Sequence, residues 1–196
     1  MAWISDATPD DDPTGEVAAA FDKDRSSLGY VAGYTRVFAH RPAVLRGWQG
    51  LNGSIKGMDP RRYEVATTAA ALRLRSSYCA LAHGQVLATT HMSPDAVRSL
   101  ASGAPCDELT EVDHAVARLA ATVAAGAADM RADDLDELRG LGCTDDEILD
   151  VVLAAAARCF FSTVLDAVGA RPDAAYSQLD ASLREALTVG RPIADA

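Results

Sequence analysis

Apolar residues recur along this chain at intervals of three and four, which is the spacing of an amphipathic α-helix. The clearest stretch begins at Thr144, where a hydroxyl and the carboxylate of Glu147 form a capping box ahead of an apolar run that reaches Gly169. Asp59 followed by Pro60 marks another helix start, because Asp accepts hydrogen bonds from end amides and Pro fits the first turn. No stretch shows the two-residue alternation of a strand, so the sequence predicts an all-α fold.

The same signals divide the chain into helical segments separated by Gly and Pro. The segments lie at about 14–28, 34–40, 42 onward, 59–75, 76–90, 94 onward, 107–125, 133–141, 144–169 and within 172–189. We expect them to pack as a compact bundle of about eight helices around a central helical hairpin.

The composition supports close helix packing. Ala is the most frequent apolar residue and aromatic residues make up only 6% of the chain, and Ala has the highest helix propensity. Small side chains bury little area each, so a single subunit of this kind has a limited core. Burial of helix faces against other copies of the chain is a common remedy, since association stabilises the folded state.

Charge and cysteine spacing exclude several classes of partner. A formal net charge of −10 repels phosphate backbones, so no nucleic-acid partner is expected. The sequence shows neither a basic amphipathic stretch nor an apolar run of about 18 residues, so no membrane partner is expected. No secretory signal is expected at the N-terminus either. The cysteines are widely spaced and predict free thiols in a cytoplasmic protein. They are Cys79, Cys106, Cys143 and Cys159.

The candidate chemistry gathers around one helix. Cys79 and His83 are four residues apart, so their side chains share a face, and Ser76 falls on the same side. If Ser76 or Ser77 caps this helix, Cys79 lies in the first turn, where free amides and the helix dipole favour a thiolate. Glu64 reaches His83 if the two helices fold back as a hairpin, and there it would orient the ring and take part in proton transfer.

Spacing alone leaves a structural alternative open. A lone Cys in an Ala-rich helix is commonly a small buried hydrophobe, and a lone His four residues later is commonly packed or on the surface. His91 does not extend the pair into a metal site, because two helical turns from His83 is long for one ion. The sequence therefore predicts no metal and no cofactor. Trp48, Phe160 and Phe161 are expected in the core or an interface.

The run from Glu64 through Ser76-Ser-Tyr-Cys79 to His83 resembles the core of the alkyl hydroperoxidase D-like, or carboxymuconolactone decarboxylase, family. Peroxidase members of that family carry a Glu, then a Cys-x-x-Cys pair, then a His four residues after the second Cys. The resemblance implies that Glu64 and His83 form a proton relay and that Cys79 attacks peroxide. It also implies that Tyr78, a common residue at this position of the motif, contacts the substrate.

The resemblance extends to looser flanking segments. With them, the chain is similar to the longer peroxidase-related branch of the family. The resemblance covers roughly residues 14–175 and implies one helical domain there. Residues 1–13 are polar and rich in Pro and Asp, which predicts a flexible N-terminal arm, and a C-terminal helix and tail are expected at 176–196. The resemblance also implies a homo-oligomer, since trimers, dimers and hexamers occur among relatives.

The sequence departs from the family pattern at Ser76, which stands where peroxidase members have the first Cys. A serine cannot form the disulfide that resolves a sulfenic acid, so the usual redox cycle with a dithiol lipoyl partner is not expected. Ser76 can still cap the helix or donate a hydrogen bond to a thiolate. An external thiol is then the expected reductant.

Three functional hypotheses remain open. The leading one is a peroxidase-like antioxidant oxidoreductase that reduces a small hydroperoxide through a Cys79 thiolate, assisted by Glu64 and His83. The second is a non-redox decarboxylase or isomerase that uses Glu64 and His83 on a small carboxylated metabolite. The third is a catalytically silent, oligomeric helical module that binds a small ligand or partner.

Overall fold

The computed structural model describes residues 2–195, apart from the side chain of residue 11. No strand occurs in that part of the chain, as the sequence predicts. The helices are α1 (Glu16–Leu28), α2 (Gly33–Phe38), α3 (Pro42–Ile55), α4 (Pro60–Arg73), α5 (Ser77–Thr90), α6 (Pro94–Ser102), α7 (Glu111–Gly126), α8 (Asp133–Gly140), α9 (Asp145–Ala167) and α10 (Ala181–Leu187). Short 3-10 turns lie at Pro9–Asp11, Ala127–Asp129 and Ala174–Gln178.

The ten α-helices of residues 2–195 exceed the expected number of about eight. The two shortest helices, α2 and α10 with 6 and 7 residues, overlap the segments expected at 34–40 and within 172–189. Helix α7 also begins later than the expected residue 107. Its start is decided by a capping box, in which the Thr110 hydroxyl accepts from the Asp113 amide at 3.1 Å and the Asp113 carboxylate accepts from the Thr110 amide at 2.9 Å.

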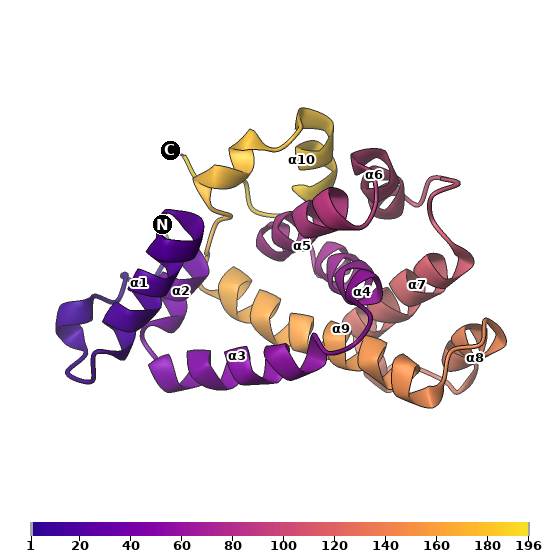
Figure 1. Ribbon diagram of the computed structural model, residues 1–196, viewed down its shortest axis with the longest axis horizontal. Helices are drawn as coiled ribbons and strands as arrows, with labels where there is room; N and C mark the ends of the chain where they lie inside the picture. Colours follow the sequence, from indigo (N-terminus) through magenta and orange to yellow (C-terminus); the bar gives the residue numbers. More distant parts are fainter. Residues whose placement is uncertain (1, 196) are drawn as a thin grey trace.

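Helix α4 lies at the centre of the bundle, surrounded by α5, α7 and α9 (Figure 1). Nine consecutive residues of this helix, from Tyr63 to Ala71, are buried. A helix buried on every side is stable only where small side chains let its neighbours approach, and α4 is rich in Ala. Its expected cap is confirmed: the Asp59 carboxylate accepts from the Arg62 amide at 2.8 Å.

An ion pair ties the start of α4 to α7. Arg61 donates to both carboxylate oxygens of Asp113, through Nε at 3.0 Å and Nη2 at 2.7 Å, and to the His91 carbonyl at 2.8 Å. Asp113 is buried. Burial opposes its ionisation, but the hydrogen bonds from Arg61 and Thr110 outweigh burial and hold the pKa of Asp113 below its ordinary value.

The expectation that a serine hydroxyl caps the start of α5 is wrong. Ser76 occupies the cap position, but its side chain accepts no hydrogen bond from an end amide. The Ser77 hydroxyl instead accepts from the Gly190 amide of the C-terminal segment at 2.7 Å. That segment approaches so closely that a Cβ at Gly190 would lie 2.0 Å from the Arg75 carbonyl oxygen. A tertiary contact has therefore replaced the local one.

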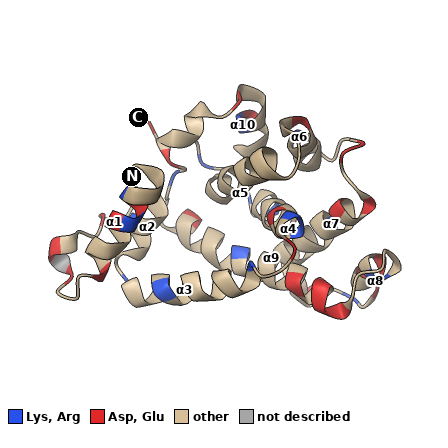
Figure 2. Cartoon of the chain, in the orientation of Figure 1, with Lys and Arg blue, Asp and Glu red and all other residues tan. Residues whose placement is uncertain are grey.

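Helix α9 is the longest element, and its expected capping box between Thr144 and Glu147 is confirmed. By length and composition alone it is apolar enough to cross a membrane, which differs from our expectation that no run reaches that length. Half of its most apolar window is buried inside the chain, where the helix contacts α3, α4, α5 and α7. Its acidic start and the neighbouring α8 gather many of the negative charges (Figure 2).

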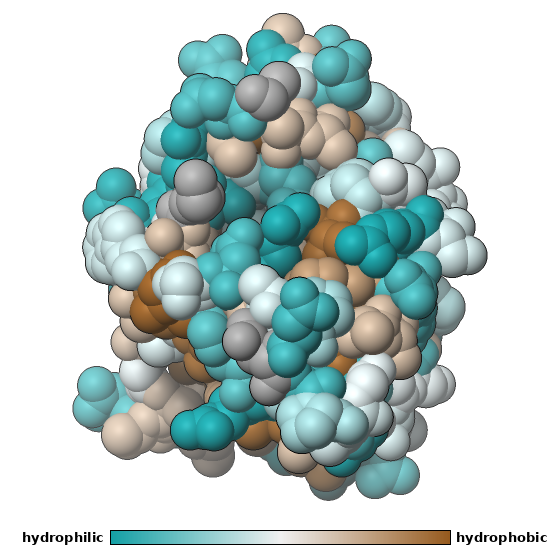
Figure 3. All heavy atoms as spheres, turned by 90° about the vertical axis from the view of Figure 1, so that its left-hand side faces the viewer, coloured by the Kyte–Doolittle hydropathy of each residue, from teal (hydrophilic) through white to brown (hydrophobic). Residues whose placement is uncertain are grey.

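The two ends of the chain pack against the helices. The Trp3 amide donates to the Val168 carbonyl at 2.7 Å, and Ala7 joins a small apolar cluster beside α1 and α2. Helix α10 contacts α5 and α6 and buries Leu183 and Leu187. The face of the molecule at the α1–α2 end is mostly hydrophilic, with small apolar patches between polar residues (Figure 3).

Candidate active site

The hairpin of α4 and α5 brings Glu64 and His83 together. Glu64 Oε2 lies 2.7 Å from His83 Nδ1, and the side chains retain only 7% and 13% of their exposure. An ionised carboxylate can only accept a hydrogen bond, so the ring proton is assigned to Nδ1. This assignment leaves Nε2 of the neutral ring with a free lone pair, and no hydrogen bond within residues 2–195 occupies it.

The environment of His83 keeps the ring neutral. Burial, and after it the positive charge of Arg158, lowers the pKa of His83 to about 4 although the Glu64 carboxylate acts in the opposite direction. At neutral pH the Nε2 atom is therefore a proton acceptor. A ring in this state serves as a general base before it can serve as a general acid.

Cys79 lies beside a buried cation. Its side chain is 1% exposed, and Arg158 on α9 donates from Nη1 to Cys79 Sγ at 3.5 Å. The guanidinium of Arg158 also lies over the rings of Trp48 and Phe161, at 5.6 and 5.4 Å. Arg158 is itself only 3% exposed, and in the described part of the chain no carboxylate forms an ion pair with it. The guanidinium is therefore a buried positive charge whose polar contact in the pocket is the sulfur of Cys79.

Sequence reasoning did not identify Arg158 as a functional residue. A signal was present, because Arg158 is the single charged residue between Asp150 and Asp166 in a long apolar run. A charge in such a run must find a partner or shift its protonation when the helix is buried. The identity of that partner, 79 residues earlier in the chain, could not be read from the run itself.

Cys79, His83 and Arg158 line one open pocket of about 410 Å³. The pocket is walled largely by aromatic side chains from α2, α3, α5, α9 and the segment after α9. They are Tyr34, Trp48, Tyr78, Phe161 and Tyr176. Trp48 and Phe161 stack on each other, with ring centroids 4.8 Å apart, so part of the predicted aromatic core also forms a wall of the site.

The remaining predicted site residues differ in position. The ring of Tyr78 lines the pocket, but its hydroxyl donates to Asp173 at 2.5 Å and accepts from the Tyr34 amide at 3.1 Å. Ser76 does not line the pocket. Its hydroxyl is buried, and its polar contact with Asp166 favours the ionised form of that carboxylate. The structure thus brings Tyr78 to the site and leaves Ser76 outside it.

No second cysteine lines the pocket among the residues that the structure describes. Cys106, Cys143 and Cys159 are half-buried free thiols, and burial raises the pKa of Cys159. In the same part of the chain no three His, Cys, Asp or Glu side chains are grouped as a metal site would require. The groups available for chemistry are thus one thiol, one imidazole–carboxylate pair and one guanidinium.

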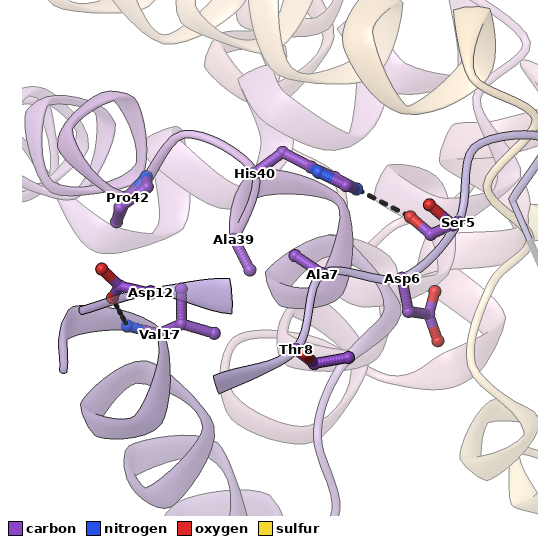
Figure 4. Close-up of a pocket in the computed structure, with 9 residues that line it drawn as sticks. All are labelled: Ser5, Asp6, Ala7, Thr8, Asp12, Val17, Ala39, His40 and Pro42. Atoms are coloured by element: carbon purple, nitrogen blue, oxygen red, sulfur yellow. Dashed lines mark hydrogen bonds between the residues drawn. The ribbon is translucent and has the colours of Figure 1, made fainter. Parts of the chain in front are cut away.

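A second hollow of about 370 Å³ lies between the N-terminal arm and the α2–α3 connection (Figure 4). There a ring nitrogen of His40 lies 2.7 Å from the Ser5 carbonyl oxygen, and the Asp12 carboxylate accepts from the Val17 amide at 2.8 Å. His40 is exposed. None of the groups around Cys79 reaches this hollow.

Known proteins are similar to this chain in structure but not detectably in sequence. No protein-family model matches the chain, and no curated protein is significantly similar to it. A peroxidase-related protein from Ralstonia eutropha JMP134, described as an alkylhydroperoxidase AhpD core, superposes with a TM-score of 0.79 at 19% identity. The match covers 90% of this chain and 94% of that one. The chain has the alkylhydroperoxidase AhpD fold.

Two further solved structures are similar to this chain. A peroxidase-related protein from Silicibacter sp. TM1040 matches with a TM-score of 0.74 at 20% identity, over 85% of this chain and 90% of that one. A cysteine-to-alanine variant of the debrominase Bmp8, in complex with 2,3,4-tribromopyrrole, matches with a TM-score of 0.67 at 16% identity, over 95% and 98%. Similarity at these identities establishes the fold and not the reaction.

Proposed function

We propose that this protein is a thiol-dependent, peroxidase-like oxidoreductase that reduces a small hydroperoxide at Cys79. The proposal rests on one arrangement within one pocket. A buried guanidinium without a carboxylate partner donates to Cys79 Sγ at 3.5 Å, and a neutral His83 backed by Glu64 lies one turn further along α5. These groups supply a nucleophile, a proton acceptor and a fixed positive charge.

In the first step Cys79 loses its proton. His83 accepts it at Nε2, and the Glu64 carboxylate stabilises the imidazolium through the bond to Nδ1. The Arg158 guanidinium stabilises the thiolate that remains. Because the folded site disfavours the charged imidazole, this proton is held for a short time and is readily given up again.

In the second step the thiolate attacks the terminal oxygen of the hydroperoxide ROOH. The S–O bond forms as the O–O bond breaks, which yields Cys79–SOH and an alkoxide RO⁻. His83 returns its proton to the alkoxide and releases ROH. The sulfur is oxidised by two electrons and the peroxide is reduced by two, while the donors of Arg158 stabilise the charge that develops on the leaving oxygen.

Regeneration uses an external thiol, since Ser76 replaces the first cysteine of the family motif and no other cysteine lines the pocket within residues 2–195. A first thiol R′SH reacts with Cys79–SOH to give a mixed disulfide and water. A second R′SH releases the Cys79 thiol and forms R′SSR′. The open pocket of about 410 Å³ offers a route to the buried sulfur.

Peroxide consumption with dithiothreitol as reductant tests the proposal. We expect Cys79→Ser to lose turnover and Cys106→Ser, a matched change at a half-buried thiol outside the pocket, to retain it. Trapping with dimedone should label Cys79 in the wild type only after peroxide is added. Equal peroxide consumption by Cys79→Ser and the wild type would show that the proposal is wrong.

A second candidate function is proton transfer without redox chemistry, of the decarboxylase or isomerase kind. It is supported by the pair of Glu64 and His83, which is complete without the thiol. This function predicts that Cys79→Ala keeps activity on a small carboxylated substrate whereas His83→Ala loses it. A silent binding module, by contrast, predicts a Cys79 that stays unreactive toward both peroxide and alkylating agents.

We also propose that the chain forms a homo-oligomer. Large apolar side chains are exposed on neighbouring helices, Val44 and Leu51 on α3 and Leu149, Leu153 and Phe160 on α9. The three on α9 follow a helical stripe, and apolar surface of this kind commonly marks an interface. Light scattering measures the mass in solution, and a monomer at micromolar concentration would contradict the proposal.

A further inference from the structure

The lysines of this chain have an unusual distribution. Lys23 and Lys56 are the only two in the sequence, which otherwise uses Arg for positive charge. One comes from α1 and the other from the C-terminal end of α3, yet both line the Cys79 pocket. No Asp or Glu side chain of the described residues lines it, although the chain carries a net charge of −10.

These cations are not neutralised by the protein. Within residues 2–195, neither Lys23 nor Lys56 forms an ion pair, whereas arginines such as Arg61 and Arg171 do. Lys56 Nζ lies over the ring of Tyr63 at 5.3 Å. Arg158, at the base of the pocket, is 3% exposed, and its Nε donor has no partner in the same residues. An anion that enters the pocket therefore meets two exposed ammonium groups that no carboxylate of residues 2–195 pairs with, while Arg158 lies deeper beside Cys79.

Aromatic rings form much of the wall between these charges, beside the polar side chains of Gln49 and Asn52. The chain is only 6% aromatic, yet five aromatic side chains line this one pocket. A volume of about 410 Å³ lies within the range for small-molecule sites. Aromatic walls favour an unsaturated ring, which can stack or meet them edge-on.

We propose that the substrate of this pocket is a small aromatic carboxylate. Its carboxylate lies at the rim with Lys23 and Lys56, and its ring lies along the aromatic wall. Its reacting group then faces Cys79. This inference rests on the proposed function for the nature of that group, an aromatic hydroperoxide that bears a carboxylate.

The carboxylate is assigned to the lysines rather than to Arg158 for a structural reason. The side chains of Lys23 and Lys56 are exposed and unpaired, whereas Arg158 already donates to Cys79 Sγ. An ammonium is a mobile point charge that accepts an anion without demanding a fixed geometry. The lysines therefore select the charged end of the ligand while Arg158 remains with the thiol.

Binding of benzoate, with neutral benzamide of the same shape as the comparison, tests the charge requirement by isothermal titration calorimetry. We expect wild-type protein to bind benzoate roughly tenfold more tightly than benzamide, because each exposed ion pair contributes modestly. The double variant Lys23→Ala/Lys56→Ala should lose this preference. The control Arg73→Ala/Arg131→Ala removes two exposed charges outside the pocket and should keep it.

Three results would overturn the inference. One is equal affinity of the wild type for benzoate and benzamide. Another is unchanged benzoate affinity in the double lysine variant. The third is an equal loss in the arginine control, which would assign the effect to the net charge of the protein rather than to the pocket. Raising the salt concentration should weaken benzoate and leave benzamide unaffected.

A kinetic comparison separates this inference from the proposed peroxidase activity. With cumene hydroperoxide and its para-carboxylate as substrates, we expect the carboxylate to lower KM roughly tenfold in the wild type, and the double lysine variant to remove the difference. If neither compound is reduced but benzoate still binds through Lys23 and Lys56, the peroxidase proposal fails and the anion site stands. If both compounds are reduced with equal KM and the protein binds benzoate no more tightly than benzamide, the peroxidase proposal stands and the anion site fails.

Discussion

Replacement of Arg158 by Met is the most direct perturbation of the site. Methionine has a similar length and no charge, so the change removes the guanidinium 3.5 Å from Cys79 Sγ with little change in volume. In the intact protein this positive charge opposes the cost of a negative charge on a thiol that is 1% exposed. Without Arg158, burial acts alone and favours the neutral thiol.

The size of the effect follows from the distance. Two unit charges 3.5 Å apart attract by about 5 kcal/mol at an effective dielectric constant of about 20. Desolvation of both groups offsets part of this energy, and buried hydrogen bonds to charged groups retain about 1.5–3 kcal/mol. Since about 1.4 kcal/mol corresponds to a factor of ten, Arg158→Met should lower the thiolate fraction of Cys79 at neutral pH by roughly 10- to 100-fold.

Site-resolved alkylation with iodoacetamide measures this fraction. Peptide mass spectrometry follows Cys79 separately from Cys106, Cys143 and Cys159, which act as internal references. The useful quantity is the rate at about pH 7 divided by the plateau rate at high pH, because the plateau corrects for changed access to the pocket. Arg158→Lys should recover part of the ratio, since it keeps the charge without the planar fork.

An unchanged ratio in Arg158→Met would refute the reasoning, because the guanidinium would then have no influence on the thiolate. A lower plateau with an unchanged ratio would refute it as well, since only access to Cys79 would have altered. Urea unfolding checks that the variant folds. We expect stability to be preserved, because Met has a similar length and Cys79 becomes neutral by keeping its proton, so that no buried charge is left unpaired.

Three further predictions concern stability in urea. Unfolded His83 binds a proton near its ordinary pKa of 6.5 and folded His83 only near about 4, so the wild type should lose roughly 3 kcal/mol as the pH falls through this window; His83→Gln should lose much less. Gly190→Ala should cost about 1–3 kcal/mol, because its Cβ would lie 2.0 Å from the Arg75 carbonyl oxygen; an unaltered midpoint would contradict this contact. Arg61→Met should cost about 3–5 kcal/mol by leaving the buried Asp113 carboxylate unpaired, and Arg61→Met/Asp113→Asn should recover part of that loss.

Local features were predictable from the sequence because the interactions that produce them lie within one helical turn. The caps at Asp59 and Thr144 join residues three apart, and the shared face of Cys79 and His83 follows from a separation of four residues. The all-α fold follows from the same periodicity. The predicted helix cap by Ser77 is wrong because of a long-range contact. Its hydroxyl accepts a hydrogen bond from an amide 113 residues away.

The surroundings of Cys79 depend on the tertiary structure. By itself the sequence determined that a thiol and an imidazole share one face of a helix, since that geometry is set by the backbone. Only the tertiary placement of α1, α3 and α9 decided that Lys23, Lys56 and Arg158 line the same pocket as Cys79. The periodicity of apolar residues indicates which face of a helix is apolar, but it does not indicate which distant helix packs against that face. The charge around the thiol therefore depends on long-range packing.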